Sequence, residues 1–197
     1  LTITELGTKI DPEKDKVYFK GEIVNKNEEN IYLILNKPRG YVTSFEHKGK
    51  KTIDKFLKGF KHLAYAGRLD EDSRGLIFLS NDGDLINKLT HPRYEHEKEY
   101  IVQTYNNISD DDLEKMRNGI ELDDEKTKSC KIKRLSKNKF SIILEEGRNR
   151  QIRRMLEKLN QKVKDLKRIR IKNIELGDLG EGKIRILTKK ETDILKQ

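Results

Sequence analysis

The apolar residues of this 197-residue chain occur in short runs of at most five, such as the stretch from Ile31 to Leu35. A helix that crosses a bilayer needs about 20 consecutive apolar residues, so these runs exclude a membrane-spanning segment. Runs of this length that are rich in β-branched residues and bounded by turn residues predict β-strands. Leu, Ile, Val and Phe make up about 27% of the chain, which is enough for a hydrophobic core. We therefore expect a globular protein with several short strands.

The predicted elements mix strands with helices. Strands are predicted at residues 31–36, 76–80, 100–104, 140–145, 169–174 and 183–187, and helices at residues 52–57, 84–89, 111–118 and 151–159. They do not alternate regularly as strand, helix and strand, which favours an α+β fold around a largely antiparallel, mixed sheet with flanking helices. The polar linker of residues 25–30 predicts a domain boundary, with a first domain over residues 1–26 and a second over residues 30–197.

The charge of the chain is unevenly distributed. The formal net charge is +9, and residues 144–172 hold 11 basic residues against four acidic ones, whereas residues 110–128 hold eight acidic residues against four basic ones. A basic side suits a polyanionic partner, because Lys and Arg contacts to phosphates release condensed counterions. A solvated basic helix face without a partner is the alternative.

The sequence lacks the patterns of disulfides and of metal sites. The single cysteine, Cys130, excludes an internal disulfide and a Cys-rich zinc site, and favours a reducing, cytoplasmic compartment. Residues 177–183 have the spacing of a phosphate-binding loop, but Ile184 replaces the Ser or Thr that holds magnesium. Residues 70–81 begin like a calcium loop but do not end in Glu, and His96 has no second His at the spacing of a zinc protease. No metal is expected.

Asp70 is the first candidate functional residue. It lies on a loop bounded by Gly67 and Gly75, directly before the predicted strand at residues 76–80. Loops held by rigid elements commonly carry reactive groups. The alternative is an ordinary aspartate that caps a turn.

The helix predicted at residues 151–159 supplies two arginines with different surroundings. Its apolar residues recur at intervals of three and four and form one stripe. At about 100° per residue, Arg153 borders that stripe and can turn toward a carboxylate, whereas Arg154 lies on the far side and can face solvent or phosphate. The alternative for Arg153 is a surface ion pair with Glu157, worth about 0.3–0.5 kcal/mol.

Four motifs follow one another between residues 36 and 155. They are Asn36-Lys37-Pro38-Arg39-Gly40, Gly67-Arg68-Leu69-Asp70, Thr90-His91-Pro92-Arg93-Tyr94 with Lys98-Glu99-Tyr100, and Glu146-Gly147-Arg148-Asn149-Arg150-Gln151-Ile152-Arg153-Arg154-Met155. Together they resemble the small/large ribosomal-subunit pseudouridine synthase family of bacteria, and the resemblance covers residues 30–187. It implies the pseudouridine synthase fold with a central catalytic cleft. It also implies an isomerase that converts a specific uridine of ribosomal RNA, in the large-subunit 23S RNA, to pseudouridine without a cofactor.

The resemblance assigns roles to individual residues. It makes Asp70 the catalytic aspartate, acting as nucleophile or base, and Arg153 its ion-pair partner, since a nearby guanidinium lowers the pKa of an aspartate by about 1–3 units. It makes Tyr100 the aromatic residue that packs against the target uracil, which keeps the detached base in place; a core tyrosine is the alternative. The residues expected to contact RNA are Arg68, Arg148, Arg150, Arg154, Lys37 and Arg168. For Lys37 the alternative is a role in shaping the turn at the end of the first strand.

The implied partner is ribosomal RNA or a pre-ribosomal particle, bound by a monomer. Gly7–Ile10 and Val17–Val24 resemble the back half of an S4 RNA-binding module, which would occupy residues 1–26. Two other functions stay open. One is a non-catalytic RNA-binding or ribosome-assembly protein on the same fold. The other is a base-excising glycosidase, which needs a second carboxylate such as Asp72 to activate water.

Overall fold

The computed structural model describes residues 8, 10–11, 14–23, 29–60 and 62–197. Contacts divide the chain into two units, Leu1–Asn30 and Ile31–Gln197. In the first unit, β1 (Tyr18–Phe19) and β2 (Glu22–Ile23) form an antiparallel hairpin. The segments compared with the S4 module lie partly outside the described residues, so the S4-like domain over residues 1–26 stays a prediction.

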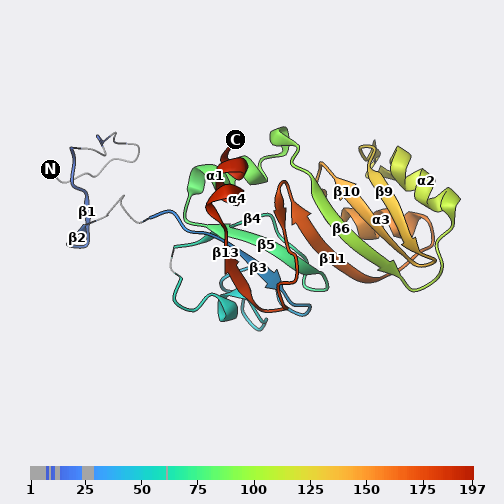
Figure 1. The fold of residues 1–197 in the computed structure, drawn as a ribbon, viewed down its shortest axis with the longest axis horizontal. Helices are drawn as coiled ribbons and strands as arrows, with labels where there is room; N and C mark the ends of the chain where they lie inside the picture. The colour runs from blue at the N-terminus through green and yellow to red at the C-terminus, as the bar shows by residue number, and fades with distance from the viewer. Residues whose placement is uncertain (1–7, 9, 12–13, 24–28, 61) are drawn as a thin grey trace. The chain divides into compact units, whose positions relative to one another are not determined.

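The second unit is built on a nine-stranded sheet (Figure 1). Along its main path the strands are β13 (Ile184–Ile186), β3 (Tyr32–Lys37), β5 (Arg74–Ser80), β11 (Val163–Ile171), β6 (Lys98–Thr104), β10 (Lys139–Leu144) and β9 (Lys131–Ser136). Two further strands are attached to it, because β12 (Ile174–Glu175) pairs with β11, and β4 (Ala64–Ala66) pairs with β5. Only β5 and β11 pair in parallel; the other pairs described in this sheet are antiparallel. The predicted α+β fold with a largely antiparallel, mixed sheet is confirmed.

Helices flank this sheet, and several of them begin at side-chain caps. They are α1 (Gly83–Thr90), α2 (Asp110–Asn118), α3 (Gln151–Lys158) and α4 (Lys189–Lys196), with 3₁₀ turns η1 (Ile53–Phe56) and η2 (Pro92–Tyr94). A short hairpin of β7 (Glu121–Leu122) and β8 (Glu125–Lys126) lies between α2 and β9. Asp82 accepts a hydrogen bond from the backbone at the start of α1, and Ser109 does the same for α2. Such caps satisfy N–H groups that have no partner within the helix.

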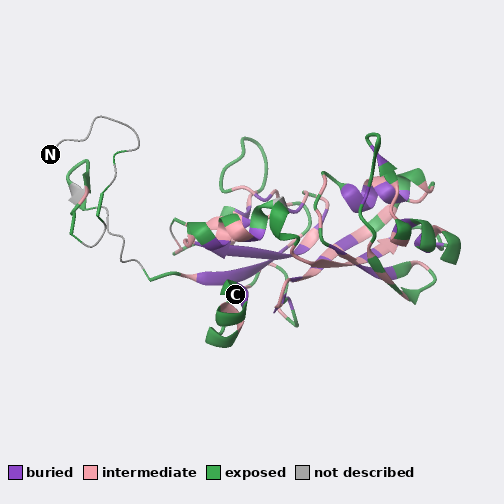
Figure 2. Cartoon of the chain, turned by 90° about the horizontal axis from the view of Figure 1, so that it is seen from above, coloured by how far each residue is buried: buried purple, intermediate pink, exposed green. Residues whose placement is uncertain are grey.

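The core lies on both faces of the central strands. Along β3, Leu33 and Leu35 belong to one buried cluster and Ile34 to another, so the strand is covered on both sides. This is why β3 and β5 appear in the sequence as continuous apolar runs rather than alternating ones. A third cluster joins α2 and α3 to β6 and β10. Figure 2 shows the buried residues gathered along the strands and the exposed ones on loops and outer helix surfaces.

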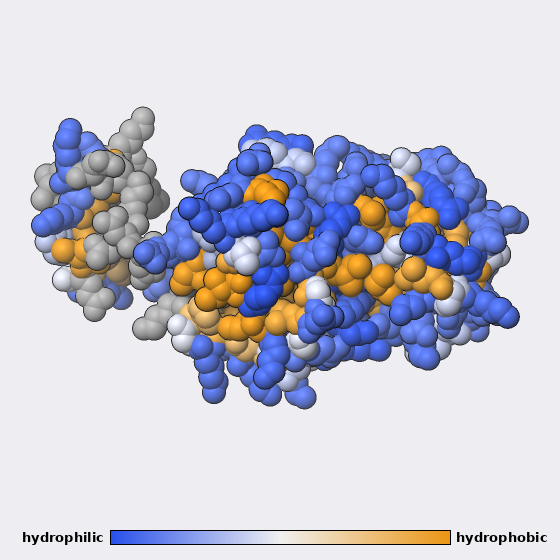
Figure 3. Space-filling model, viewed as in Figure 1, coloured by the Kyte–Doolittle hydropathy of each residue, from blue (hydrophilic) through white to orange (hydrophobic). Residues whose placement is uncertain are grey.

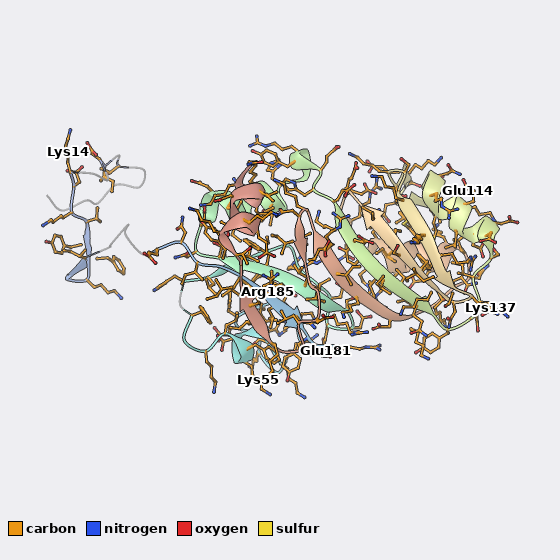
Figure 4. The ribbon with its side chains drawn as sticks, viewed as in Figure 1. Lys14, Lys55, Glu114, Lys137, Glu181 and Arg185 are labelled. Carbon is orange, nitrogen blue, oxygen red and sulfur yellow. The ribbon has the colours of Figure 1, made fainter. Side chains whose placement is uncertain are left out.

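β13 forms one edge of the sheet and is fastened to α4. On the face seen in Figure 3, hydrophobic residues show around this edge within a largely hydrophilic surface, and Ile186 is 63% exposed. Arg185, labelled in Figure 4, donates from Nη1 and Nη2 to the two carboxylate oxygens of Glu191, at 2.8 and 2.9 Å. Glu191 also completes a capping box with Thr188 at the start of α4. This bidentate ion pair therefore joins the edge strand β13 to the C-terminal helix α4.

Candidate active site

The sheet forks between β5 and β11. Their parallel pairing consists of two residue pairs, Lys167 with Arg74 and Arg168 with Gly75. Over residues 78–80, the strand that pairs with this edge of β5 is β4 instead of β11. The loop of residues 67–73, which joins β4 to β5, therefore lies where the two strands separate.

Gly75 allows the strands to meet at the base of this fork. A Cβ at this position would lie 2.2 Å from the carbonyl oxygen of Arg168, and φ of Gly75 is +109°. Only glycine accommodates both conditions. The neighbouring Arg74 donates to Asp165 on β11 and to Glu181 before β13, each at 2.7 Å. A close backbone contact and two ion pairs thus fix the base of the fork.

The loop at the fork is tied down on both sides of Asp70. Thr43 Oγ1 donates to the carbonyl oxygen of Leu69 at 2.8 Å and accepts from the backbone N–H of Leu69 at 3.0 Å. The N–H of Ser73 donates to the carbonyl oxygen of Asp70 at 3.1 Å and closes a turn. The side chain of Asp70 is 37% exposed. The loop therefore presents a carboxylate on a backbone that is held in place.

Two arginines at the start of α3 approach this loop. Arg150 precedes the helix with φ +49°, and its guanidinium lies 3.4 Å from Asp70 Oδ2 and 3.2 Å from Asp72 Oδ2. Arg153 lies one turn into the helix with its side chain 8% exposed, and its Nη1 lies 3.3 Å from Asp72 Oδ2. Arg153 Nη2 also donates to the carbonyl oxygen of Asp72 at 3.0 Å and to Ser73 Oγ at 3.1 Å. The expected pairing of Asp70 with Arg153 is corrected: Asp70 pairs with Arg150, and Arg153 pairs with Asp72.

The two aspartates differ in how firmly they are held. Burial opposes ionisation of Asp72, but the hydrogen bond from Arg150 and the charge of Arg153 outweigh it and hold the pKa of Asp72 below its ordinary value. Burial lowers the pKa of Arg153, against the opposing effect of Asp72. Asp72 is therefore an ionised group shared by two arginines, whereas Asp70 has a single, longer ion pair. The two side chains are similarly exposed, at 36% and 37%.

A cavity of about 630 Å³ opens beside the loop. Of the predicted site residues, those that line it are Arg68, Asp70, Tyr100, Arg148, Arg150 and Arg168. Arg153, Arg154 and Lys37 lie outside its lining. A cavity of this volume is large enough for a nucleotide-sized ligand.

Tyr100 lies on β6 with one side toward the cavity. Its Cα partner on β11 is Arg168, and its ring packs against two of the buried clusters. Tyr100 is thus both a core residue and a wall of the cavity, so the two interpretations of this residue are compatible.

Two residues expected to bind RNA are buried instead. Lys37 is fully buried, and its Nζ donates to the carbonyl oxygens of Pro38 at 3.1 Å and Tyr41 at 2.5 Å. Burial lowers the pKa of Lys37 to about 8, with the nearby Asp70 acting in the opposite direction. Arg168 is 2% exposed, and its Nε donates to the carbonyl oxygen of Leu76 at 2.7 Å. A buried cation cannot contact a phosphate on the surface, so burial argues against that kind of RNA contact for both residues. A contact of Arg168 with RNA inside the cavity stays a prediction.

The other arginines that were predicted to contact RNA differ in whether hydrogen bonds and ion pairs within the protein already engage them. Arg148 donates to backbone carbonyls of residues 122–126 and pairs with Glu146, which holds the β7–β8 hairpin. Arg154 pairs with Asp123. Arg68 is exposed at the cavity wall. Arg68 and Arg150 are therefore the arginines best placed to meet a ligand in the cavity.

The sequence reasoning missed residues at the cavity wall, above all Lys98. Residues two apart on a strand share a face, so the position of Tyr100 is a signal that could have identified Lys98. The cavity is also lined by His91, Arg93, His96, Glu95 and Lys128. The last two form an ion pair between the segment before β6 and the loop after β8.

Within the described residues, no cluster of three or more His, Cys, Asp or Glu side chains is suited to a metal ion. No helix in the described part of the chain is long and apolar enough to span a membrane.

A carboxylate loop at the fork of a mixed sheet, facing a cavity with arginines and a tyrosine, defines the class of proteins with the pseudouridine synthase fold. A solved structure, described as a pseudouridylate synthase, matches with a TM-score of 0.81 and 34% identity, covering 95% of this chain and 83% of the other. The sequence pattern of the RNA pseudouridylate synthase family matches residues 31–158. The chain belongs to this family.

Two curated relatives show how much of a family member the chain represents. It is 39% identical over 188 residues to the dual-specificity RNA pseudouridine synthase RluF of Escherichia coli, a match covering 94% of this chain and 64% of the relative. It is 39% identical over 202 residues to the ribosomal large subunit pseudouridine synthase B of Bacillus subtilis, covering 98% of this chain and 82% of the relative. The chain thus spans less than two thirds of the first relative and most of the second.

Proposed function

We propose that this protein is an isomerase that converts a uridine of ribosomal RNA to pseudouridine, with Asp70 as the reacting carboxylate. The observation that carries the proposal is the accessible carboxylate of Asp70, held on a tied loop in the wall of a cavity that also contains Tyr100. Membership of the RNA pseudouridylate synthase family supports the activity. The name of the Bacillus subtilis relative supports a substrate in the large ribosomal subunit.

The reaction breaks the N1–C1′ bond of uridine, turns the uracil and joins C5 to C1′. An ionised Asp70 can attack the sugar, or it can remove a proton from the sugar to give a glycal. Both routes require an ionised carboxylate, and the guanidinium of Arg150 lies 3.4 Å from Asp70 Oδ2. The ring of Tyr100 in the cavity wall can pack against the detached uracil, which favours recombination over escape.

Arg153 acts in this proposal as a positioning residue. It contacts Asp72 and Ser73, two and three residues after Asp70 in the loop, and it lies outside the cavity lining. Its buried guanidinium therefore fixes the conformation of the loop that carries Asp70.

The target uridine must leave its base stack before it reaches Asp70. This costs a few kcal/mol, least for a base in a loop or junction. Contacts from Arg68 and Arg150 to the RNA can offset part of that cost, because both guanidinium groups lie at the cavity. We further propose that the protein acts as a monomer in the cytoplasm, on ribosomal RNA or a pre-ribosomal particle.

A base-excising glycosidase is less well supported. Such an enzyme needs a second carboxylate that accepts a proton from water. Asp72 is engaged by Arg150 and Arg153, and its pKa is held below the ordinary value, which makes it a weak base. A non-catalytic RNA-binding protein leaves the accessible Asp70 without a role.

The test uses ribosomal RNA that carries tritium at C5 of uridine, since isomerisation replaces the C5–H bond and releases tritium to water. Asp70→Asn keeps the shape of the side chain but removes the charge, and we expect no tritium release. Glu71→Gln, in the same loop but outside the cavity lining, is the matched control and is expected to retain activity. Tritium release by Asp70→Asn at the wild-type rate, or stoichiometric free uracil from the wild type, contradicts the proposal.

A further inference from the structure

Arg168 carries a buried guanidinium that the fold only partly uses. Its Nε donates to the carbonyl oxygen of Leu76 across the fork, at 2.7 Å. Nη2 is buried and has no hydrogen-bond partner, and Arg168 takes part in no ion pair within the described part of the protein. A buried cation without a counter-charge is costly, and bridging two strands through Nε needs only one of its five N–H groups. The remaining donors call for a functional explanation.

Arg168 lies next to the loop of residues 67–73, which carries Asp70. A Cβ on Gly67, the first residue of that loop, would lie 3.7 Å from Arg168 Nη1. In the register between β11 and β6, Arg168 is opposite Tyr100. The cavity beside the loop is lined by all three of Arg168, Tyr100 and Asp70. The guanidinium therefore lies between the loop that carries the carboxylate and the strand that carries the tyrosine.

Lys98 adds a second cation on the same wall. It precedes Tyr100 by two residues on β6, so both side chains are on one face of the strand. Lys98 lines the cavity, and its Nζ donates to the carbonyl oxygen of His96 at 3.1 Å, which leaves two N–H groups for a ligand. Burial and then the charge of Arg168 lower the pKa of Lys98, as expected for two cations held near each other.

The proposed reaction creates negative charge inside this cavity. When the N1–C1′ bond breaks, its electron pair stays on N1, and the uracil leaves as an anion whose charge is shared with the carbonyl oxygens O2 and O4. In the nucleophilic route, a carboxylate oxygen of Asp70 bonds to C1′ as the N1–C1′ bond breaks. In the glycal route, that carboxylate removes the C2′ proton, and the C2′–H electron pair forms the C1′=C2′ double bond. Donors fixed where charge develops stabilise such a step more than the ground state.

We propose that Arg168 and Lys98 donate hydrogen bonds to the carbonyl oxygens of the detached uracil and stabilise its negative charge until C5 bonds to C1′. The inference rests on the proposed function and assigns two further catalytic residues at the same site. A surface phosphate is a poorer ligand for Arg168, because this residue is 2% exposed and lies within the cavity wall.

The experiment compares two leaving bases. Single-turnover rates of N1–C1′ bond loss are measured with RNA that carries uridine or 5-fluorouridine at the target position, by digestion to nucleosides and chromatography. Fluorine withdraws electrons and stabilises the uracil anion by itself. We expect Arg168→Met to slow the uridine substrate about 100-fold, as for the loss of one oxyanion donor, and the fluorinated substrate distinctly less. The dissociation constant of the RNA complex is expected to change little.

Lys98→Met provides an independent variant if Arg168→Met does not fold, because the side chain of Lys98 bridges no strands. We expect the same smaller loss with the fluorinated substrate. Arg170→Met is the matched control on β11, because Arg170 pairs with Glu97 and Glu99 outside the cavity lining; both rates should stay near wild type.

Equal losses on both substrates in the folded variants, or no loss, overturn the inference while the proposed function stands. A wild type that does not isomerise uridine, or an Asp70→Asn variant that does, overturns both. A smaller loss with 5-fluorouridine in either folded variant supports the inference.

Discussion

Gly75→Ala tests whether the fork between β5 and β11 positions the active site. The new Cβ would lie 2.2 Å from the carbonyl oxygen and 2.7 Å from the nitrogen of Arg168, about 1 Å closer than an ordinary contact. Both atoms are backbone, so no side-chain rotation relieves the overlap. The positive φ of Gly75 adds strain for any L-residue, roughly 1–2 kcal/mol, and overpacking of a close contact costs about 1–3 kcal/mol. We therefore expect the free energy of unfolding to fall by about 2–5 kcal/mol.

The same change must move Arg168 and the loop of residues 67–73, so catalysis should fall together with stability. Unfolding in urea is followed by circular dichroism, since the chain has no Trp for fluorescence, and activity is followed by tritium release. Gly83→Ala is the control, because a Cβ there meets nothing within 4 Å and Gly83 opens α1. A Gly75→Ala protein with wild-type stability and activity would show that the close strand contact does not position the site.

Two further predictions concern the supports of the site and of the C-terminal helix. Thr43→Val removes the hydroxyl that hydrogen-bonds both the N–H and the carbonyl oxygen of Leu69. We expect the free energy of unfolding in urea to fall by about 1–3 kcal/mol and the activity to fall with it. Unchanged stability and activity would show that these hydrogen bonds do not hold the loop. The hydrogen bond from Arg185 lowers the pKa of Glu191 to about 2. Because this folded-state pKa lies below the unfolded value, the stabilisation is present above about pH 4.5 and is lost as the pH falls toward 2. Glu191→Gln should therefore flatten the fall of the urea midpoint between about pH 5 and pH 3, and a parallel fall in both proteins would refute this reasoning.

The central strands could be predicted because they are buried on both faces. β3 and β5 each appear as an uninterrupted apolar run, so the pattern identifies them without knowledge of their partners. The predicted helix at residues 84–89 corresponds to α1, and those at residues 111–118 and 151–159 correspond to α2 and α3. The segment at residues 52–57 forms the shorter 3₁₀ turn η1.

Other elements were missed because their residues are mainly polar. β9 (Lys131–Ser136) and α4 (Lys189–Lys196) carry many charges and have little buried surface, so their structure depends on partners distant in sequence. β11 begins at Val163 rather than at residue 169. Its first half was missed because two charged residues follow each apolar one there, which is not the alternation of a strand. The fork also depends on long-range pairing, which no local pattern indicates.

At the site, the sequence identified the loop and the helix but not which carboxylate pairs with which arginine. Asp70 and Asp72 are two residues apart, and Arg150 and Arg153 are three apart, so several pairings are compatible with the spacing. The left-handed backbone of Arg150 directs its side chain toward Asp70, while Arg153 turns inward to Asp72.

The burial of Lys37 and Arg168 was also not visible from the sequence, because charged residues are rarely fully buried. Lys37 donates to two carbonyl oxygens of the turn that follows it, and Arg168 donates to a carbonyl oxygen on a strand distant in sequence.

The most direct test of the central claim is a map of pseudouridine across ribosomal RNA. The RNA is taken from cells that lack the protein and from the same cells supplied with the wild type or with Asp70→Asn. We predict at least one pseudouridine that is absent without the protein, returns with the wild type and does not return with Asp70→Asn. Identical maps in all three, or restoration by Asp70→Asn, would contradict the account.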